Sequence, residues 1–183
     1  QAIEFTTEIF NLIKNSKTIS ELETIADKLK IPEKNRMNVD SYPKIEFDIK
    51  PNEIQSLIDK KIIDKDLNFE SNINERLSDP LTKLLYAIAW KNDDLKKIKH
   101  IIKGVLEAET ENNNQNDALV FYQFGKYLTK NAGQPIIDQH VIRAFAVYNS
   151  TNPEIITKLR KLGTLDKKHK QLIADYKELD VLI

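Results

Sequence analysis

Asp138 is the residue of this chain whose type and position most clearly allow chemistry. It lies in the run PIIDQHVIRAF, where Val141 and Ile142 follow it at helical spacing. Its carboxylate is therefore expected at the first turn of a helix, near the side that carries the apolar stripe. The free N–H groups and the dipole of that turn favour the ionised form. Such a group can activate water as a general base or stabilise a developing positive charge. The alternative is an ordinary N-cap, where aspartate is common.

Two predicted helices, separated by a tight turn, position this acid within residues 116–148. Gly133 and Pro135 interrupt the helical pattern and mark the turn. Apolar residues recur at helical spacing on both sides of it. They are Val120, Phe121, Phe124 and Leu128 before the turn, and Val141, Ile142, Phe145 and Tyr148 after it. Asp138 is therefore expected where a short buried extended piece meets the second helix.

The run around Asp138 resembles the aspartate-bearing stretch of the helix-hairpin-helix superfamily of DNA glycosylases, which includes endonuclease III-like and 8-oxoguanine glycosylase-like enzymes. In that stretch an apolar pair precedes Asp-x-His-Val/Ile, and an arginine follows shortly after. The matching positions here are Ile136, Ile137, Asp138, His140, Val141 and Arg143. The resemblance implies that Asp138 assists hydrolysis of the N-glycosidic bond of a damaged or modified base in DNA. It implies that His140 and Arg143 support the local structure.

The resemblance covers about residues 78–149, since an apolar helix and a helix pair precede the aspartate, as in the family. Two family features are missing. Residues 109–117 contain no glycine, whereas the family's glycine-rich turn binds a DNA phosphate there. Residues 117–120 contain no lysine, whereas bifunctional members place their attacking amine there. The resemblance therefore implies a monofunctional enzyme. Lys126, two turns further along the same helix, is a further catalytic candidate; alternatively it lies on a solvated helix face.

Candidate substrate-binding residues lie at the end of the predicted helix 81–90 and on the helix before Asp138. Trp90, Lys91 and Asn92 occupy a position where such folds often face an extruded base. Trp90 could stack on the base and Asn92 could hydrogen-bond its edge; the alternative for Trp90 is a place in the core. Tyr122 and Gln123 are further candidates.

Composition limits the other kinds of function. The chain has 183 residues, with 28 basic and 28 acidic side chains, so its formal net charge is zero and DNA binding would need local segregation of charge. The lysine-rich side of residues 93–103 could contact phosphates, or it is a solvated face. The chain contains no cysteine, and its histidines are scattered, so we expect neither a metal nor another cofactor. No apolar run has the length of a membrane span and no signal peptide is recognised, which favours a cytoplasmic protein.

The spacing of apolar residues predicts an all-α fold of about eight to ten helices. We expect a single domain over residues 1–183, with an N-terminal part (1–65), a glycosylase-like core (78–149) and C-terminal helices (152–183). The segment LTKLLYAIAW, residues 81–90, is apolar nearly all round and is therefore predicted to be the most buried helix. An extended connector, with a short strand as the alternative, is expected over residues 33–50.

Local signals predict several helix ends. Ser20 with Glu23 has the pattern of a capping box, and Asp79-Pro80 and Asn152-Pro153 each combine a capping residue with an early proline. Asn92 or Asp93 is expected to cap the helix that follows. A helix starting at Pro51 or Asn52 is expected to end near Lys65. Gly163 is expected to be the C-cap of the helix that Asn152 and Pro153 begin.

Two functions remain open from the sequence. Asp138 and its flanking residues favour a glycosylase-like protein that acts on DNA. The missing glycine hairpin and the balanced charge favour a non-catalytic helical module for protein or nucleic-acid interaction.

Overall fold

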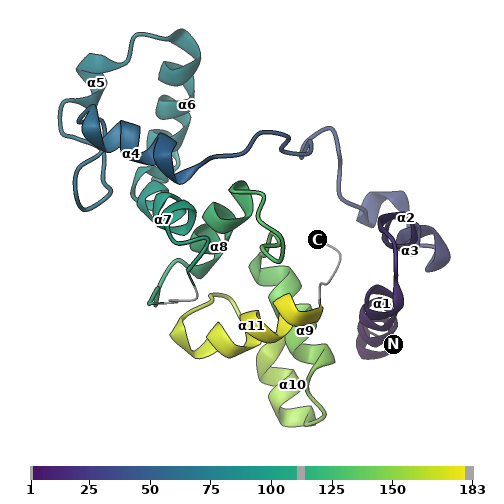
Figure 1. Ribbon diagram of the computed structural model, residues 1–183. Helices are drawn as coiled ribbons and strands as arrows, with labels where there is room; N and C mark the ends of the chain where they lie inside the picture. The colour runs from purple at the N-terminus through teal and green to yellow at the C-terminus, as the bar shows by residue number, and fades with distance from the viewer. Residues whose placement is uncertain (1, 111–113, 180–183) are drawn as a thin grey trace. The chain divides into compact units, whose positions relative to one another are not determined.

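A computed structural model describes residues 2–110 and 114–179, which are helical and contain no β-strand (Figure 1). The prediction of an all-α fold is confirmed. The α-helices are α1 (Ala2–Asn15), α2 (Ile19–Glu23), α3 (Ile25–Lys28), α4 (Pro51–Asp59), α5 (Ile73–Arg76), α6 (Pro80–Lys91), α7 (Leu95–Leu106), α8 (Leu119–Leu128), α9 (Gln139–Tyr148), α10 (Pro153–Leu159) and α11 (Lys170–Leu179). Two 3-10 turns, η1 (Glu33–Asn35) and η2 (Lys167–His169), complete the fold. None of the described helices is long and apolar enough to cross a membrane.

The chain forms two compact units. The first unit consists of residues 1–47 together with residues 137–183, and the second consists of residues 48–136. Helices α1–α3 and α9–α11 therefore belong to the first unit, and helices α4–α8 to the second. The boundary at 136/137 falls inside the run that carries Asp138.

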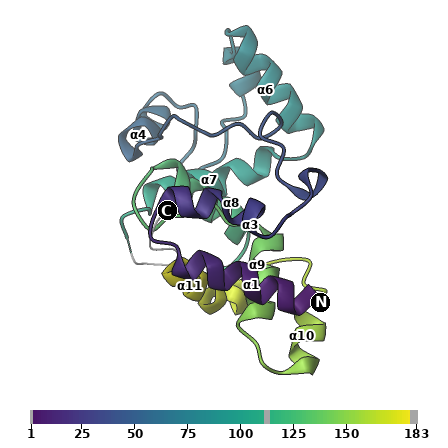
Figure 2. The same cartoon turned by 90° about the vertical axis from the view of Figure 1, so that its right-hand side faces the viewer.

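Helix α9 is the centre of the first unit, because α1, α10 and α11 all pack against it; α1 runs beside it in Figure 2. Phe145 of α9 lies edge-on to Phe10 of α1, with ring centres 5.5 Å apart, and edge-on to Tyr176 of α11 at 5.4 Å. Ile142, one turn earlier on α9, is completely buried. This aromatic and aliphatic core fixes the helix whose first turn carries Asp138.

The second unit is organised around the pair α7 and α8, which are the most extensively packed helices of the chain. Gly104 of α7 and Gly125 of α8 lie where the two helices cross, with their Cα atoms close together. A second contact joins α4 to α7 through a cluster of buried aliphatic residues. Its members are Ile54, Ile63, Ile102 and Val105.

The prediction that residues 81–90 form the most buried helix is wrong. In α6, Leu81, Leu84, Leu85, Ile88 and Trp90 are each between 59% and 67% exposed. Helix α6 touches the rest of its unit mainly through α7 and through the edge-on pair of Tyr86 and Phe69, whose ring centres are 6.0 Å apart. An apolar composition favours burial only if other elements cover the helix, and here α4, α7 and the turn at 62–69 fill the core instead.

Helix caps test the boundaries predicted from the sequence. Asp79 caps α6 by accepting a hydrogen bond from Thr82 N at 2.8 Å, and Asn152 caps α10 by accepting from Glu154 N at 2.9 Å, as predicted. The side chain of Thr18, rather than that of Ser20, caps α2. Helix α7 begins after Asp94, not after Asn92 or Asp93.

Other predicted ends are corrected by the backbone. Helix α4 ends at Asp59 rather than near Lys65, because Lys61 takes a left-handed conformation and Ile62 N–H bonds back to Leu57 O. Helix α10 ends at Leu159, before Gly163. The connector at 33–50 contains η1 and no strand within its described residues.

Candidate functional site

Asp138 is the N-cap of α9, as predicted. Its Oδ1 atom accepts hydrogen bonds from His140 N at 2.6 Å and from Val141 N at 2.8 Å. The backbone at Asp138 is extended, with φ −133° and ψ 170°, and its carbonyl oxygen accepts the first helical bond from Ile142 N at 3.1 Å. The buried side chain of Ile137 precedes it and anchors the entry to the helix.

The two carboxylate oxygens of Asp138 differ in their surroundings. Both cap bonds go to Oδ1, whereas Oδ2 accepts no hydrogen bond from any described residue. The residue itself is exposed to solvent. One oxygen therefore holds the carboxylate in place at the positive end of a helix, while the other is open to water or a ligand.

A hollow of about 230 Å³ begins on the first turn of α9. Its lining comes from α1, α9 and the end of α10 and consists of Ile3, Thr6, His140, Arg143, Ala144, Val147 and Arg160. Asp138 does not line this hollow. The concavity predicted beside the acid therefore begins at His140, two residues further along the chain. Arg143 also supports the local structure, because its Nε donates to Leu162 O at 2.9 Å and holds the chain that follows α10.

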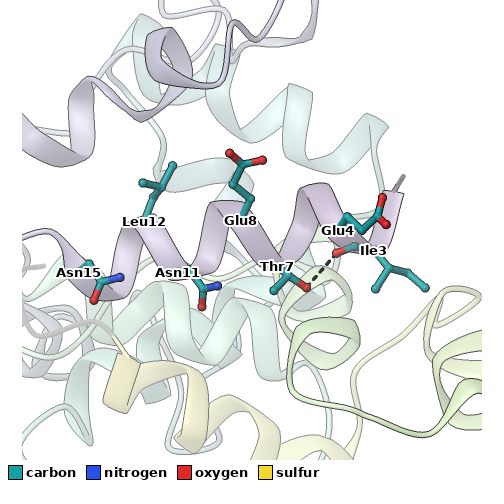
Figure 3. A pocket seen from close by; sticks show the side chains of 7 residues that line it. All are labelled: Ile3, Glu4, Thr7, Glu8, Asn11, Leu12 and Asn15. Carbon is teal, nitrogen blue, oxygen red and sulfur yellow. Dashed lines mark hydrogen bonds between the residues drawn. The ribbon is translucent and has the colours of Figure 1, made fainter.

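A second hollow of the first unit, of about 450 Å³, follows α1 and is lined by residues of that helix alone (Figure 3). Glu8 and Leu12 project to one side of α1, whereas Thr7 and Asn11 project to the other. The Thr7 hydroxyl donates to Ile3 O at 2.9 Å, and Asn11 Oδ1 accepts from Tyr148 Oη at 3.1 Å. These side chains do not converge on a common point, so we do not assign a site there.

Lys126 lies on α8 in the second unit and is only 6% exposed, so the alternative of a solvated helix face is wrong. Its Nζ donates to Thr110 O at 3.4 Å and lies 5.1 Å from the centre of the Tyr122 ring. Burial lowers the pKa of Lys126, and the nearby Glu107 carboxylate opposes that shift. The amine is thus held inside the α7–α8 pair.

Tyr122 and Gln123, two of the predicted substrate-binding residues, are buried and bonded within the second unit. Tyr122 Oη donates to Glu107 Oε2 at 2.8 Å, and burial together with this acid raises the pKa of Tyr122 far above its ordinary value. Gln123 Nε2 donates to Pro135 O at 3.1 Å and to Gln134 Oε1 at 3.2 Å. Gln123 therefore fixes the segment that leads to Asp138.

Trp90, Lys91 and Asn92 are exposed at the C-terminal end of α6. Trp90 is 67% exposed, so the alternative that placed it in the core is wrong. These three residues belong to the second unit together with Tyr122, Gln123 and Lys126, whereas Asp138, His140 and Arg143 belong to the first. Within the second unit, the structure brings Lys126 and Tyr122 together; within the first, it joins Arg143 and His140 in one hollow.

Sequence patterns do not identify three residues that contact the candidate residues or line the hollow with them. Glu107 and Thr110 contact α8 across 15 and 16 residues of chain, and Arg160 reaches the hollow beside α9 from the end of α10. No spacing rule connects residues so far apart.

Among the described residues, no group of three or more histidines, aspartates or glutamates could hold a metal ion.

A second hydrogen-bond network joins α7 to the loop that precedes α8. The side chain of Gln115 is buried, and its Nε2 donates to Asp117 O at 2.6 Å and lies 2.9 Å from His100 Nδ1. Burial is the main cause that lowers the pKa of His100; Lys99 and Lys103 lower it further, and Asp117 opposes them. The neutral imidazole, whose Nδ1 can accept a hydrogen bond, is the form that suits this network.

Acidification is therefore expected to destabilise the second unit through His100. Below the ordinary histidine pKa of 6.5, the unfolded chain binds a proton that the folded chain does not, so the free energy of unfolding decreases as the pH falls. Thermal melts between pH 7.5 and pH 5 measure this slope above the range in which Asp79 and Asp166 titrate. His100→Asn should flatten the slope. An unchanged slope in His100→Asn would contradict the assignment.

No protein-family model, no curated protein and no solved structure matches this chain.

Proposed function

We propose that this chain is a glycosylase-like protein that hydrolyses the N-glycosidic bond of a damaged or modified base in DNA, with Asp138 as its essential group. The observation that carries the proposal is the position of the Asp138 carboxylate. Oδ1 is fixed by His140 N and Val141 N at the N-terminus of α9, and Oδ2 accepts no hydrogen bond from the described chain. A fixed, accessible carboxylate is what a reaction with a positively charged sugar transition state requires.

The chemistry needs one water molecule and one carboxylate. The C1′–N bond breaks and its electron pair leaves with the base, while positive charge develops on the sugar. Water adds to C1′ and loses a proton, for which Asp138 Oδ2 is the acceptor, and the departing base gains a proton from solvent. The products are a free base and an abasic site.

The surroundings of Lys126 support a monofunctional reaction. Its amine is buried against the Tyr122 ring and donates to Thr110 O, so it is engaged within its own helix pair. A lyase that works through a Schiff base needs an amine that reaches C1′ of the sugar. Water is therefore the nucleophile in this proposal.

An excision assay with borohydride tests this proposal. Duplexes that each carry one uracil, one 8-oxoguanine or one alkylated purine are incubated with the purified protein and then treated with alkali. We expect strand cleavage at one of these bases only after alkali, and no covalent protein–DNA adduct with borohydride. An adduct that disappears in Lys126→Ala would contradict the monofunctional mechanism, and the absence of excision from every duplex would overturn the proposal.

A second candidate function, a non-catalytic helical module, is favoured by the exposed side of α6. Leu81, Leu84, Leu85 and Ile88 follow the spacing of a single helix face and are each at least 59% exposed. A contiguous exposed apolar face of this kind is typical of surfaces that bind a protein partner.

Leu84→Gln tests whether that face is open in solution. Leu84 is already 63% exposed, so the free energy of unfolding should change by no more than about 0.5 kcal/mol. Ile102→Ala, at a position only 5% exposed, is the contrasting control and should cost roughly 2–5 kcal/mol. Urea unfolding followed by circular dichroism measures both. A loss of about 2 kcal/mol or more in Leu84→Gln would show that the face is packed and would remove the basis of this second candidate.

A further inference from the structure

The hollow beside α9 brings two arginines and a histidine together from different elements of the first unit. Arg143 and His140 come from α9, and Arg160 from the end of α10, while Ile3, Ala144 and Val147 give the hollow an apolar lining. Its volume of about 230 Å³ is several times that of a water molecule. None of its lining residues is acidic.

The donors in this hollow are largely unused by the protein. Arg143 donates a hydrogen bond only from its Nε, to Leu162 O. Its two terminal nitrogens have no partner among residues 2–110 and 114–179. The guanidinium of Arg160 and the ring of His140 likewise have no side-chain partner in that part of the chain. Arg143 and Arg160 give the lining two positive charges and no carboxylate, and this balance favours a bound anion.

We propose that this hollow is a binding site for a phosphoryl group, either a free or terminal phosphate or a phosphodiester. A guanidinium presents paired N–H donors that match two oxygens of a phosphate, and two arginines line the site, Arg143 from α9 and Arg160 from the residue after α10. Donors that approach from two elements suit a tetrahedral anion with oxygens on several sides, rather than a planar carboxylate. The apolar lining from Ile3, Ala144 and Val147 contacts whatever the phosphate carries.

The site is distinct from the carboxylate of Asp138, which does not line the hollow. It does not depend on base excision, because a phosphoryl site on α9 and α10 is equally compatible with a protein that cleaves no bond. Its test is therefore a binding measurement that involves no damaged base.

Isothermal titration of the full chain with inorganic phosphate, in a phosphate-free buffer, measures the affinity directly. Arg160→Gln should weaken binding about tenfold or more, because it removes charge-assisted hydrogen bonds to the anion but no hydrogen bond or ion pair between the Arg160 side chain and another described residue. Lys161→Gln is the matched control: it removes one positive charge from the neighbouring position, outside the lining, and should leave the affinity unchanged. Ala144→Leu keeps both arginines but fills the hollow, and should abolish binding.

Two further ligands distinguish the source of the phosphoryl group. Thymidine dinucleotide with a 5′-phosphate carries a terminal group and a diester, and the same dinucleotide without it carries the diester alone. Binding of only the first identifies a terminal phosphate, and equal binding of both identifies a nucleic-acid backbone. In either case the affinity should fall in Arg160→Gln. The proposal is overturned if no ligand of the three binds saturably, or if Arg160→Gln and Lys161→Gln weaken binding equally.

Discussion

Asp138→Asn should reduce base excision by roughly 10²- to 10⁴-fold, the range over which a positioned acid or base contributes to catalysis. Asparagine retains the Oδ1 acceptor for His140 N and Val141 N, so the start of α9 should keep its geometry. The substitution removes only the negative charge and the ability of the second oxygen to accept a proton. The rate of base release under single-turnover conditions measures the loss of activity, and the melting temperature of the same sample reports on folding.

Asp79→Asn is the matched control for this experiment. Asp79 is also an N-cap aspartate, it accepts a hydrogen bond from Thr82 N at 2.8 Å, and it is exposed to solvent. Each substitution should lower the melting temperature only slightly, because asparagine keeps the oxygen that accepts the capping hydrogen bonds. Only Asp138→Asn should affect excision. Equal turnover in Asp138→Asn and the unsubstituted chain would leave the aspartate as a helix cap.

Gly125→Ala should unfold the second unit or destabilise it by about 3 kcal/mol or more, at the upper end of the cost of overpacking. A Cβ atom at Gly125 would lie 2.0 Å from Ile101 O, and one at Gly104 would lie 2.0 Å from Tyr122 O. Both neighbours are backbone carbonyl groups of an opposing helix, so no side-chain rotation relieves the clash. Helices α7 and α8 would have to separate. The gain of about 1 kcal/mol from the better helix propensity of alanine does not offset this cost.

Gly163→Ala is the control for the glycine substitution. No atom lies within 4 Å of the Cβ position at Gly163, and its backbone is not in the left-handed region. Its stability should be unchanged or higher by about 0.4–1 kcal/mol, through the reduced freedom of the unfolded chain. Urea unfolding compares the two variants, and hydrogen exchange locates the loss in α7 and α8. A Gly125→Ala variant as stable as Gly163→Ala would contradict the close helix crossing.

The parts of this structure that could be predicted from the sequence are those decided by neighbouring residues. The caps at Asp79, Asp138 and Asn152 depend on a side chain and the two or three amides that follow it, and all three were predicted. The exposure of α6 could not be predicted, because its apolar composition does not reveal which other helices fill the core.

Local sequence patterns also could not predict the surroundings of the candidate residues. Lys126 contacts Thr110 across 16 residues, and Tyr122 contacts Glu107 across 15, so their burial depends on how α7 crosses α8. The available signal was the isolated glycine in each of these helices. A glycine within a helical pattern costs stability and often marks a close approach of two backbones.

The order of the two units along the chain has a consequence for synthesis on the ribosome. The second unit is one continuous segment, residues 48–136, whereas the first is assembled from both ends of the chain. Phe10 of α1 can pack on Phe145 of α9 only after the whole intervening segment has been translated. Until then, the side of α1 that carries Phe10 is not covered by α9, whereas all of residues 48–136 are already available to fold. A translation pause after residue 136 would prolong the time for which Phe10 lacks its partner on α9.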